Sequence, residues 1–222
     1  MITVRFDNEI QQAAPSMEVL AIEAELTNPP TSDALWAEVT DTASGIARKY
    51  SLQQINKRPA IAATRAAYKA LGKEPNRYRP SAEALCRRAV KGMGLYRIDS
   101  LVDIINIVSM QSGYSIGGFD ADIIDGDTVT LGRGRQAEPF EAIGRGQLNI
   151  EGLPVYRDDT GPIGTPTSDH ERTKLTPETR HLLMLVNIYG IEMPPEEVEC
   201  ITRRLLEKYC SLSSFSTKLF RP

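Results

Sequence analysis

Long apolar runs are missing from the sequence. No stretch of 18 or more apolar residues occurs in its 222 positions, so no membrane-spanning helix is expected. The first residues, Met1-Ile2-Thr3-Val4-Arg5-Phe6-Asp7, lack the charged and apolar regions of a signal peptide. The three cysteines are odd in number and show no C-x-x-C spacing, which argues against a disulfide framework and a cysteine-based zinc site. We therefore expect a cytoplasmic protein in a reducing compartment.

The sequence also has few histidines and a small net charge. Two histidines without an H-x-x-x-H spacing do not favour a metal-dependent hydrolase, and we expect neither a metal ion nor another cofactor. The formal net charge of −3 means that any nucleic-acid binding must come from a local basic surface. Apolar residues (41%) and charged residues (25%) occur at the frequencies of an ordinary globular protein.

The length suits one domain. We predict a single domain over residues 1–222, with a mainly helical part at 1–75 and a C-terminal helix and tail at 192–222. The sequence leaves open whether the chain forms homo-oligomers.

Hydrophobic periodicity and capping residues predict the regular elements. Helices are expected at about 33–49, 60–71, 82–92 with Ser81 as cap, 98–110 and 195–210, and strands at 17–25, 128–131, 138–143, 148–150 and 154–157. Leu182–Tyr189 has strand length, although a buried helix would show the same pattern. Asp125-Gly126-Asp127 predicts a hairpin, Ser112–Asp120 a glycine-rich loop, and 211–222 a loosely held tail. This order predicts an α+β fold in which sheets of short, largely antiparallel strands pack on each other with helices outside.

The segment Asp158–Thr173 interrupts every regular period. Gly161-Pro162 and Gly164-Thr165-Pro166 each impose a bend, and the polar run Ser168-Asp169-His170-Glu171-Arg172-Thr173 follows. We hypothesise that this polar loop lines a pocket together with the glycines after the 98–110 helix. The alternative is an ordered surface loop closed by its own Ser and Asp side chains.

A second unusual segment is rich in arginine. Its basic residues are Arg77, Arg79, Arg87, Arg88, Lys91 and Arg97, with Tyr78 and Tyr96 among them. Arginine suits phosphate contacts and tyrosine suits base stacking, so the segment is a candidate nucleic-acid footprint. Solvated helix charges paired with nearby acids would give the same pattern.

Two polar residues, Asp103 and Asn106, lie three positions apart on the apolar 98–110 helix and therefore face the same way. Buried polar groups need hydrogen-bond partners. We interpret the pair mainly as anchors for adjoining loops and secondarily as substrate contacts.

Four motifs in order resemble a known family: Ser81-Ala-Glu-Ala-Leu-Cys-Arg-Arg88, Leu101-Val-Asp-Ile-Ile-Asn106, Gly113 to Phe119-Asp120, and the Gly-x-x-Gly loop. Over about residues 78–189 the chain resembles the third and fourth domains of the phenylalanyl-tRNA synthetase beta chain. It is especially similar to free-standing proteins of that type, in which G-P-x-G-x-P-T-S-D-x-E-R-T is typical. The resemblance implies a layered β/β/α fold and a site that, in the synthetase, hydrolyses mischarged tyrosyl-tRNA.

Only some residues of the family's editing site are present in this sequence. The family normally has a histidine at the position of Gly117 and a glutamate at that of Leu185. The positions that match are Asp103, Asn106, Phe119, Asp120, Gly161 and Gly164. Two polar groups of the family's editing site are therefore missing from this chain.

Three functions follow: hydrolysis of mischarged aminoacyl-tRNA in trans, non-catalytic binding of tRNA or an amino acid through the same pocket, or a structural module without the chemistry. A complete synthetase activity is not expected. The candidate catalytic residues are Asp169, Glu171 and His170. Candidate substrate contacts are Asn106, Gly117, Gly118, Phe119, Gly161, Gly164, Thr165, Ser168, Arg172 and Thr173, and candidate RNA contacts are Arg79, Arg87 and Arg88. The expected partner is tRNA or aminoacyl-tRNA.

Overall fold

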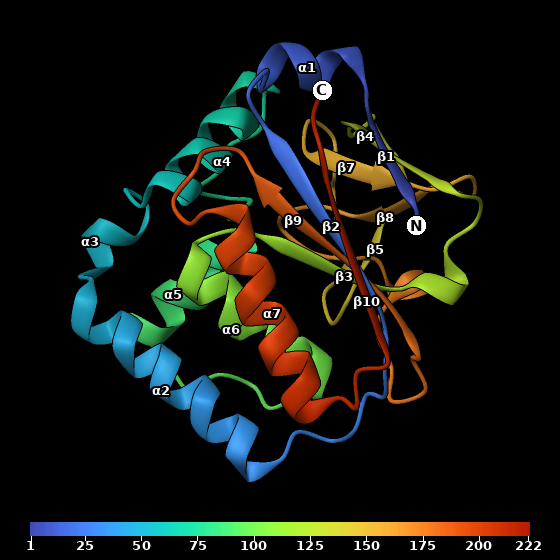
Figure 1. Ribbon diagram of the computed structural model, residues 1–222. Helices are drawn as coiled ribbons and strands as arrows, with labels where there is room; N and C mark the ends of the chain where they lie inside the picture. Colours follow the sequence, from blue (N-terminus) through green and yellow to red (C-terminus); the bar gives the residue numbers. More distant parts are fainter.

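The computed structural model describes residues 1–222 and is built around two four-stranded sheets (Figure 1). The first sheet has the order β1 (Thr3–Phe6), β4 (Thr128–Arg133), β7 (Pro154–Arg157), β8 (Pro162–Gly164), in which only β1 and β4 are parallel. The second sheet is antiparallel throughout, with the order β10 (Ser214–Phe220), β2 (Glu18–Glu25), β9 (His181–Ile188), β3 (Ile116–Asp120). A small hairpin joins β5 (Glu141–Ala142) to β6 (Gly146–Gln147).

The helices lie mainly on one side of the second sheet (Figure 1). They are α1 (Asn8–Ala13), α2 (Asp33–Lys49), α3 (Leu52–Ile55), α4 (Pro59–Ala70), α5 (Ser81–Val90), α6 (Ser100–Ser112) and α7 (Pro195–Tyr209), with single 3₁₀ turns at Ala121–Ile123 and Glu171–Thr173. No helix combines the length and the apolar character that crossing a bilayer requires.

Strands β2 and β9 explain the layering, because both of their faces are covered. In β9, Leu183 and Leu185 face the first sheet, whereas Met184 and Val186 pack against the helices. A strand that is buried on both faces is apolar without alternation, which is why Leu182–Tyr189 reads as a continuous run. The predicted α+β fold with sheet on sheet and helices outside is confirmed.

Local signals define the helix ends. The Ser32 side chain accepts a hydrogen bond from the Leu35 N–H at the start of α2, and Asp99 does the same for Val102 at the start of α6. Gly113 ends α6 with φ +78°, a conformation that favours glycine. At α5 the predicted cap is wrong: Pro80 occupies that position, and Ser81 is the first helical residue.

Four other sequence predictions are wrong, each because a distant strand decides the structure. The glycine-rich loop contains β3, which pairs with β9, and the tail contains β10, which pairs with β2. The turn at 125–127 is no hairpin, because β3 and β4 lie in different sheets. Residues 148–150 are not a strand; the partner of β5 is β6 at 146–147. The N-terminal strand β1 gave no sequence signal and is held by β4.

Candidate functional site

The polar loop Asp158–Thr173 and strand β3, which we hypothesised to line a pocket together, lie in direct contact. The backbone N–H of Gly118 donates to Asp169 Oδ2 at 3.2 Å, and Phe119 forms a β-bridge with Lys174 just beyond the loop. Within the loop, β8 and a bridge between Gly164 and Asp169 fix the backbone. The hydrogen bond between Gly118 and Asp169, 51 positions apart, therefore holds two distant segments together.

The space between these segments is filled. A Cβ at Gly117 or at Gly164 would come within 2.6 Å of Phe119 Cζ, and a Cβ at Gly164 would come within 2.8 Å of Asp169 Oδ1. The two glycines thus make room for an aromatic ring and a carboxyl group. Gly118 is packed on its other side, against Ile105 of α6.

The two departures from the family pattern face each other. Gly117 of β3 and Leu185 of β9 are direct cross-strand partners. Leu185 is fully buried in the core between the sheets, which also contains Phe119. The two positions that are polar in the family are therefore neighbours in the sheet, and both lack a polar side chain in this protein.

Asp169 is the most perturbed of the candidate catalytic residues. The residue is only half-buried overall, but its carboxyl group is enclosed, and this enclosure decides its ionisation. Burial raises the pKa of Asp169 to about 7, and the hydrogen bond from Gly118 offsets only part of that effect. The group therefore titrates near neutral pH.

Glu171 and His170 point to other partners. Glu171 pairs with Lys174 Nζ at 2.5 Å and also accepts from the Gly144 N–H at 3.3 Å. Lys174 holds the pKa of Glu171 below its usual value. His170 Nδ1 accepts from the Arg172 N–H at 3.0 Å, and its ring packs edge-on against Phe140, with centroids 5.0 Å apart. Burial lowers the pKa of His170.

The remaining loop residues also bond within the loop. Arg172 makes a two-pronged ion pair with Asp158, at 3.0 and 2.7 Å, and the Gly161 N–H donates to the same carboxylate. The Thr165 hydroxyl accepts from the Ser168 N–H at 3.1 Å. The hydroxyl of Thr173 is buried without a partner. The alternative interpretation, a loop ordered by its own side chains, describes these contacts well.

A basic cleft of about 420 Å³ lies beside the polar loop. It brings together the three candidate RNA contacts and Asn106 of α6. Its other lining residues are Ser81, Ala84, Leu85, Lys91, Met93, Tyr96 and Arg145. No acidic side chain lines it.

The charges of this basic cleft are only partly compensated. Arg79 and Arg87 lie 3.4 and 3.6 Å from Glu83, a buried carboxylate that also pairs with Arg65 at 2.8 Å. Arg88 donates to the Gly94 carbonyl at 2.6 Å, and Lys91 and Arg145 make no ion pair. One carboxylate thus faces several guanidinium groups, and an anion in the cleft would meet an excess of positive charge.

Two contacts join the basic cleft to the polar loop. The Ser81 N–H donates to the Pro166 carbonyl at 2.8 Å, and Ala142 of the β5–β6 hairpin forms a bridge with His170. The hairpin carries Arg145 into the cleft. Sequence reasoning missed Arg145, whose only signal is its place in the Gly144-Arg145-Gly146 tip, because the hairpin reaches α5 only in the folded chain.

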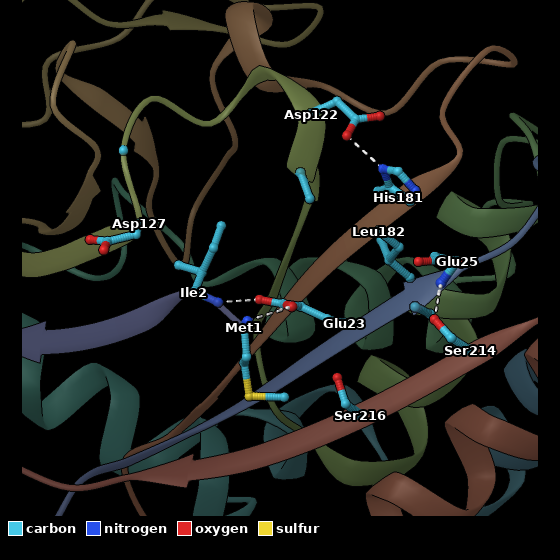
Figure 2. Close-up of a pocket in the computed structure, with 13 residues that line it drawn as sticks. Met1, Ile2, Glu23, Glu25, Asp122, Asp127, His181, Leu182, Ser214 and Ser216 are labelled. Atoms are coloured by element: carbon cyan, nitrogen blue, oxygen red, sulfur yellow. Dashed lines mark hydrogen bonds and ion pairs between the residues drawn. The ribbon is translucent and has the colours of Figure 1, made fainter.

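A second, larger cleft of about 500 Å³ lies elsewhere and contains no candidate site residue (Figure 2). Glu23, Glu25, Asp122 and Asp127 make it acidic. His181 Nδ1 lies 2.5 Å from Asp122, which raises the pKa of the histidine. No group of three or more His, Cys, Asp or Glu side chains is arranged to hold a metal ion.

Comparisons with known proteins agree with the resemblance read from the motifs. The phenylalanine–tRNA ligase beta subunit of Geobacter metallireducens is 28% identical over 107 residues, which cover 47% of this chain and 13% of the ligase subunit. That of Geobacter sulfurreducens is 33% identical over 64 residues, 29% of this chain and 8% of the subunit. The chain therefore spans a small part of these relatives.

A crystal structure of an N-terminal fragment of the phenylalanyl-tRNA synthetase beta subunit from Pyrococcus horikoshii aligns with 98% of this chain and 50% of the fragment, at 15% identity and a TM-score of 0.48. The B3/4 domain family matches residues 63–192, more than half of the sequence, which include α5, α6, the basic cleft and the polar loop. The chain belongs to the B3/4 domain family.

Proposed function

We propose that this protein binds RNA, and tRNA in particular, through the basic cleft between α5, α6 and the β5–β6 hairpin. The observation that carries the proposal is the uncompensated charge of Arg88, Lys91 and Arg145 in a cleft without an acidic side chain. Arginine and lysine side chains that make no ion pair within the protein can replace the counterions of phosphate groups. The choice of tRNA rests on the relatives, which are subunits of a tRNA ligase. A place in the cytoplasm, where translation takes place, follows from this proposal.

The test is a titration of tRNA with the wild type and with Lys91→Ala/Arg145→Ala at several salt concentrations. Each phosphate contact contributes about −0.7 to −0.9 to the slope of log K against log salt, so the double variant should lose about 1.4 to 1.8 of that slope. Neither side chain has a partner in the protein, so the free energy of unfolding of the double variant should differ from that of the wild type by less than about 0.5 kcal/mol.

The matched control is Lys218→Ala/Arg221→Ala, which removes two positive charges at the end of β10. Neither residue lines the basic cleft, and Arg221 pairs with Glu18. This control should bind tRNA like the wild type. An equal loss in both double variants would show that binding follows net charge, and an unchanged slope in Lys91→Ala/Arg145→Ala would remove the cleft from the proposal.

Hydrolysis of mischarged aminoacyl-tRNA in trans is a second candidate, favoured by one observation. Asp169 has an enclosed carboxyl group with a pKa of about 7 and lies beside the backbone N–H of Gly118. A carboxylate with such a pKa can accept a proton from an attacking water at neutral pH. The apolar pair Gly117 and Leu185 and the internal pairing of Glu171 count against this chemistry.

Deacylation of a panel of mischarged tRNAs separates the two functions. Turnover that rises with pH through about 7 and disappears in Asp169→Asn, with tRNA binding retained, would support hydrolysis. Binding without turnover on every substrate supports the binding function alone. If the protein showed neither tRNA binding nor turnover, only the structural module would remain as its function.

A further inference from the structure

One aromatic side chain at the basic cleft is presented to solvent in an unusual way. Tyr96 lies in the segment between α5 and α6, and 69% of its surface is exposed. The guanidinium carbon of Arg88 lies 4.4 Å from the centre of its ring. Arg88 is itself held by the Gly94 carbonyl at 2.6 Å, so the ring has a fixed neighbour on one face. Its high exposure leaves the opposite face in solvent.

Tyr78, the other tyrosine of the arginine-rich segment, lacks a free face of this kind. Lys73 Nζ lies 3.7 Å from its ring centre and is held there by the carbonyls of Asn149 and Glu151. Arg77 lies over the same ring at 5.6 Å. The structure therefore distinguishes two tyrosines that the sequence presents as equivalent.

The basic cleft also has apolar lining residues. Met93 lines the cleft and is 50% exposed. Ile98, two residues after Tyr96 in the sequence, does not line the cleft and is 58% exposed. Exposed apolar side chains gathered at one place indicate a contact surface. A nucleotide carries both matching parts, because its phosphate is anionic and its base has an apolar face.

We propose that Tyr96, backed by Arg88, is a stacking platform for an unpaired nucleobase, so that the basic cleft accepts single-stranded RNA in preference to duplex RNA. This inference rests on the proposed RNA binding and specifies its ligand. In a duplex the base faces are covered by their neighbours, and only backbone and groove edges reach the protein. A cleft of about 420 Å³ has the size of a small-ligand site and admits a splayed nucleotide, not a helix.

The experiment compares a short unstructured single-stranded RNA with a duplex RNA of the same length, each in fluorescence anisotropy titrations against the full chain. The single strand should bind more tightly. Tyr96→Ala should weaken single-strand binding by about 5- to 150-fold, equivalent to about 1–3 kcal/mol per stacked base, and leave duplex binding unchanged. Tyr96→Phe retains the ring and should bind like the wild type.

Two further measurements protect this test from a purely structural effect. A 2-aminopurine base in the single strand should be quenched on binding to the wild type and to Tyr96→Phe but not to Tyr96→Ala, since stacking on an aromatic ring quenches its fluorescence. Ile191→Ala removes a similarly exposed apolar side chain (66%) that does not line the basic cleft, and it should bind like the wild type.

The outcomes separate the two proposals. Duplex binding equal to or tighter than single-strand binding, or an unchanged affinity in Tyr96→Ala, would overturn the stacking platform while RNA binding stands. Absence of binding to both of these RNAs and to tRNA would overturn the RNA-binding function itself.

Discussion

The polar loop and the basic cleft both contain many polar side chains but use them differently. In the loop, Asp158 pairs with Arg172, Glu171 pairs with Lys174, and the carboxyl group of Asp169 is enclosed against Gly118. In the cleft, Lys91 and Arg145 have no partner in the protein. The dense run of polar residues in the loop therefore marks a rigid element. The positive charge that can bind a ligand lies in the neighbouring basic cleft.

Removal of Arg172 should have the largest effect. The Asp158 side chain is fully buried, and Arg172 is its charged partner at 2.7 Å. Burial would raise the pKa of Asp158, but Arg172 and backbone N–H groups outweigh burial and hold that pKa below its usual value. Arg172→Ala leaves a buried carboxylate without its charged partner, and we expect a loss of about 3 kcal/mol in the free energy of unfolding, measured by urea denaturation.

The matched control for that variant is Lys174→Ala, which breaks the more exposed pair with Glu171. This change should have no measurable effect on stability. If Arg172→Ala were as stable as Lys174→Ala, the polar loop would not be the rigid element described above.

A pH effect of intermediate size is expected from Asp169. Its folded pKa, about 7, lies above the ordinary value of 3.8, so the folded state holds a proton that the unfolded state releases between these values. The contribution of this group to stability should therefore fall as the pH rises from about 4 to 7.

Asp169→Asn should flatten the pH dependence of the urea midpoint over that range. Asp103, buried on α6 with a pKa of about 6, contributes in the same direction between about pH 4 and 6, and it remains in the variant. Asp103→Asn is thus the internal comparison. An identical slope in the wild type and in Asp169→Asn would show that the Asp169 carboxyl group is solvated.

The smallest of these effects concerns packing between β3 and the loop. Gly117→Ala would bring a Cβ to 2.6 Å from the buried ring of Phe119, and overpacking of this kind costs about 1–3 kcal/mol. Gly45 of α2 has nothing within 4 Å of its Cβ position, and Gly45→Ala should instead stabilise the helix by about 0.5–1 kcal/mol. Thermal unfolding of both variants would check the difference in sign.

Local patterns were sufficient for the helices. The period of apolar residues and the caps at Ser32 and Asp99 predicted α2 and α6, because a helix forms its hydrogen bonds between residues four positions apart. Arg87 and Arg88 of α5 line one cleft with Lys91, which follows them by four and three positions and therefore lies on the same side of the helix. The sequence identified the polar loop, but it did not predict the ion pairs and hydrogen bonds within that loop.

Long-range pairing decided the rest. A strand is stable only against a partner, so the sequence could not show that β10 would pair with β2 or that Gly117 would lie opposite Leu185. Arg145 joins the basic cleft only because the β5–β6 hairpin bridges to His170. The basic helix is thus encoded locally, whereas the cleft, its free charges and the open face of Tyr96 arise from contacts between segments far apart in the chain.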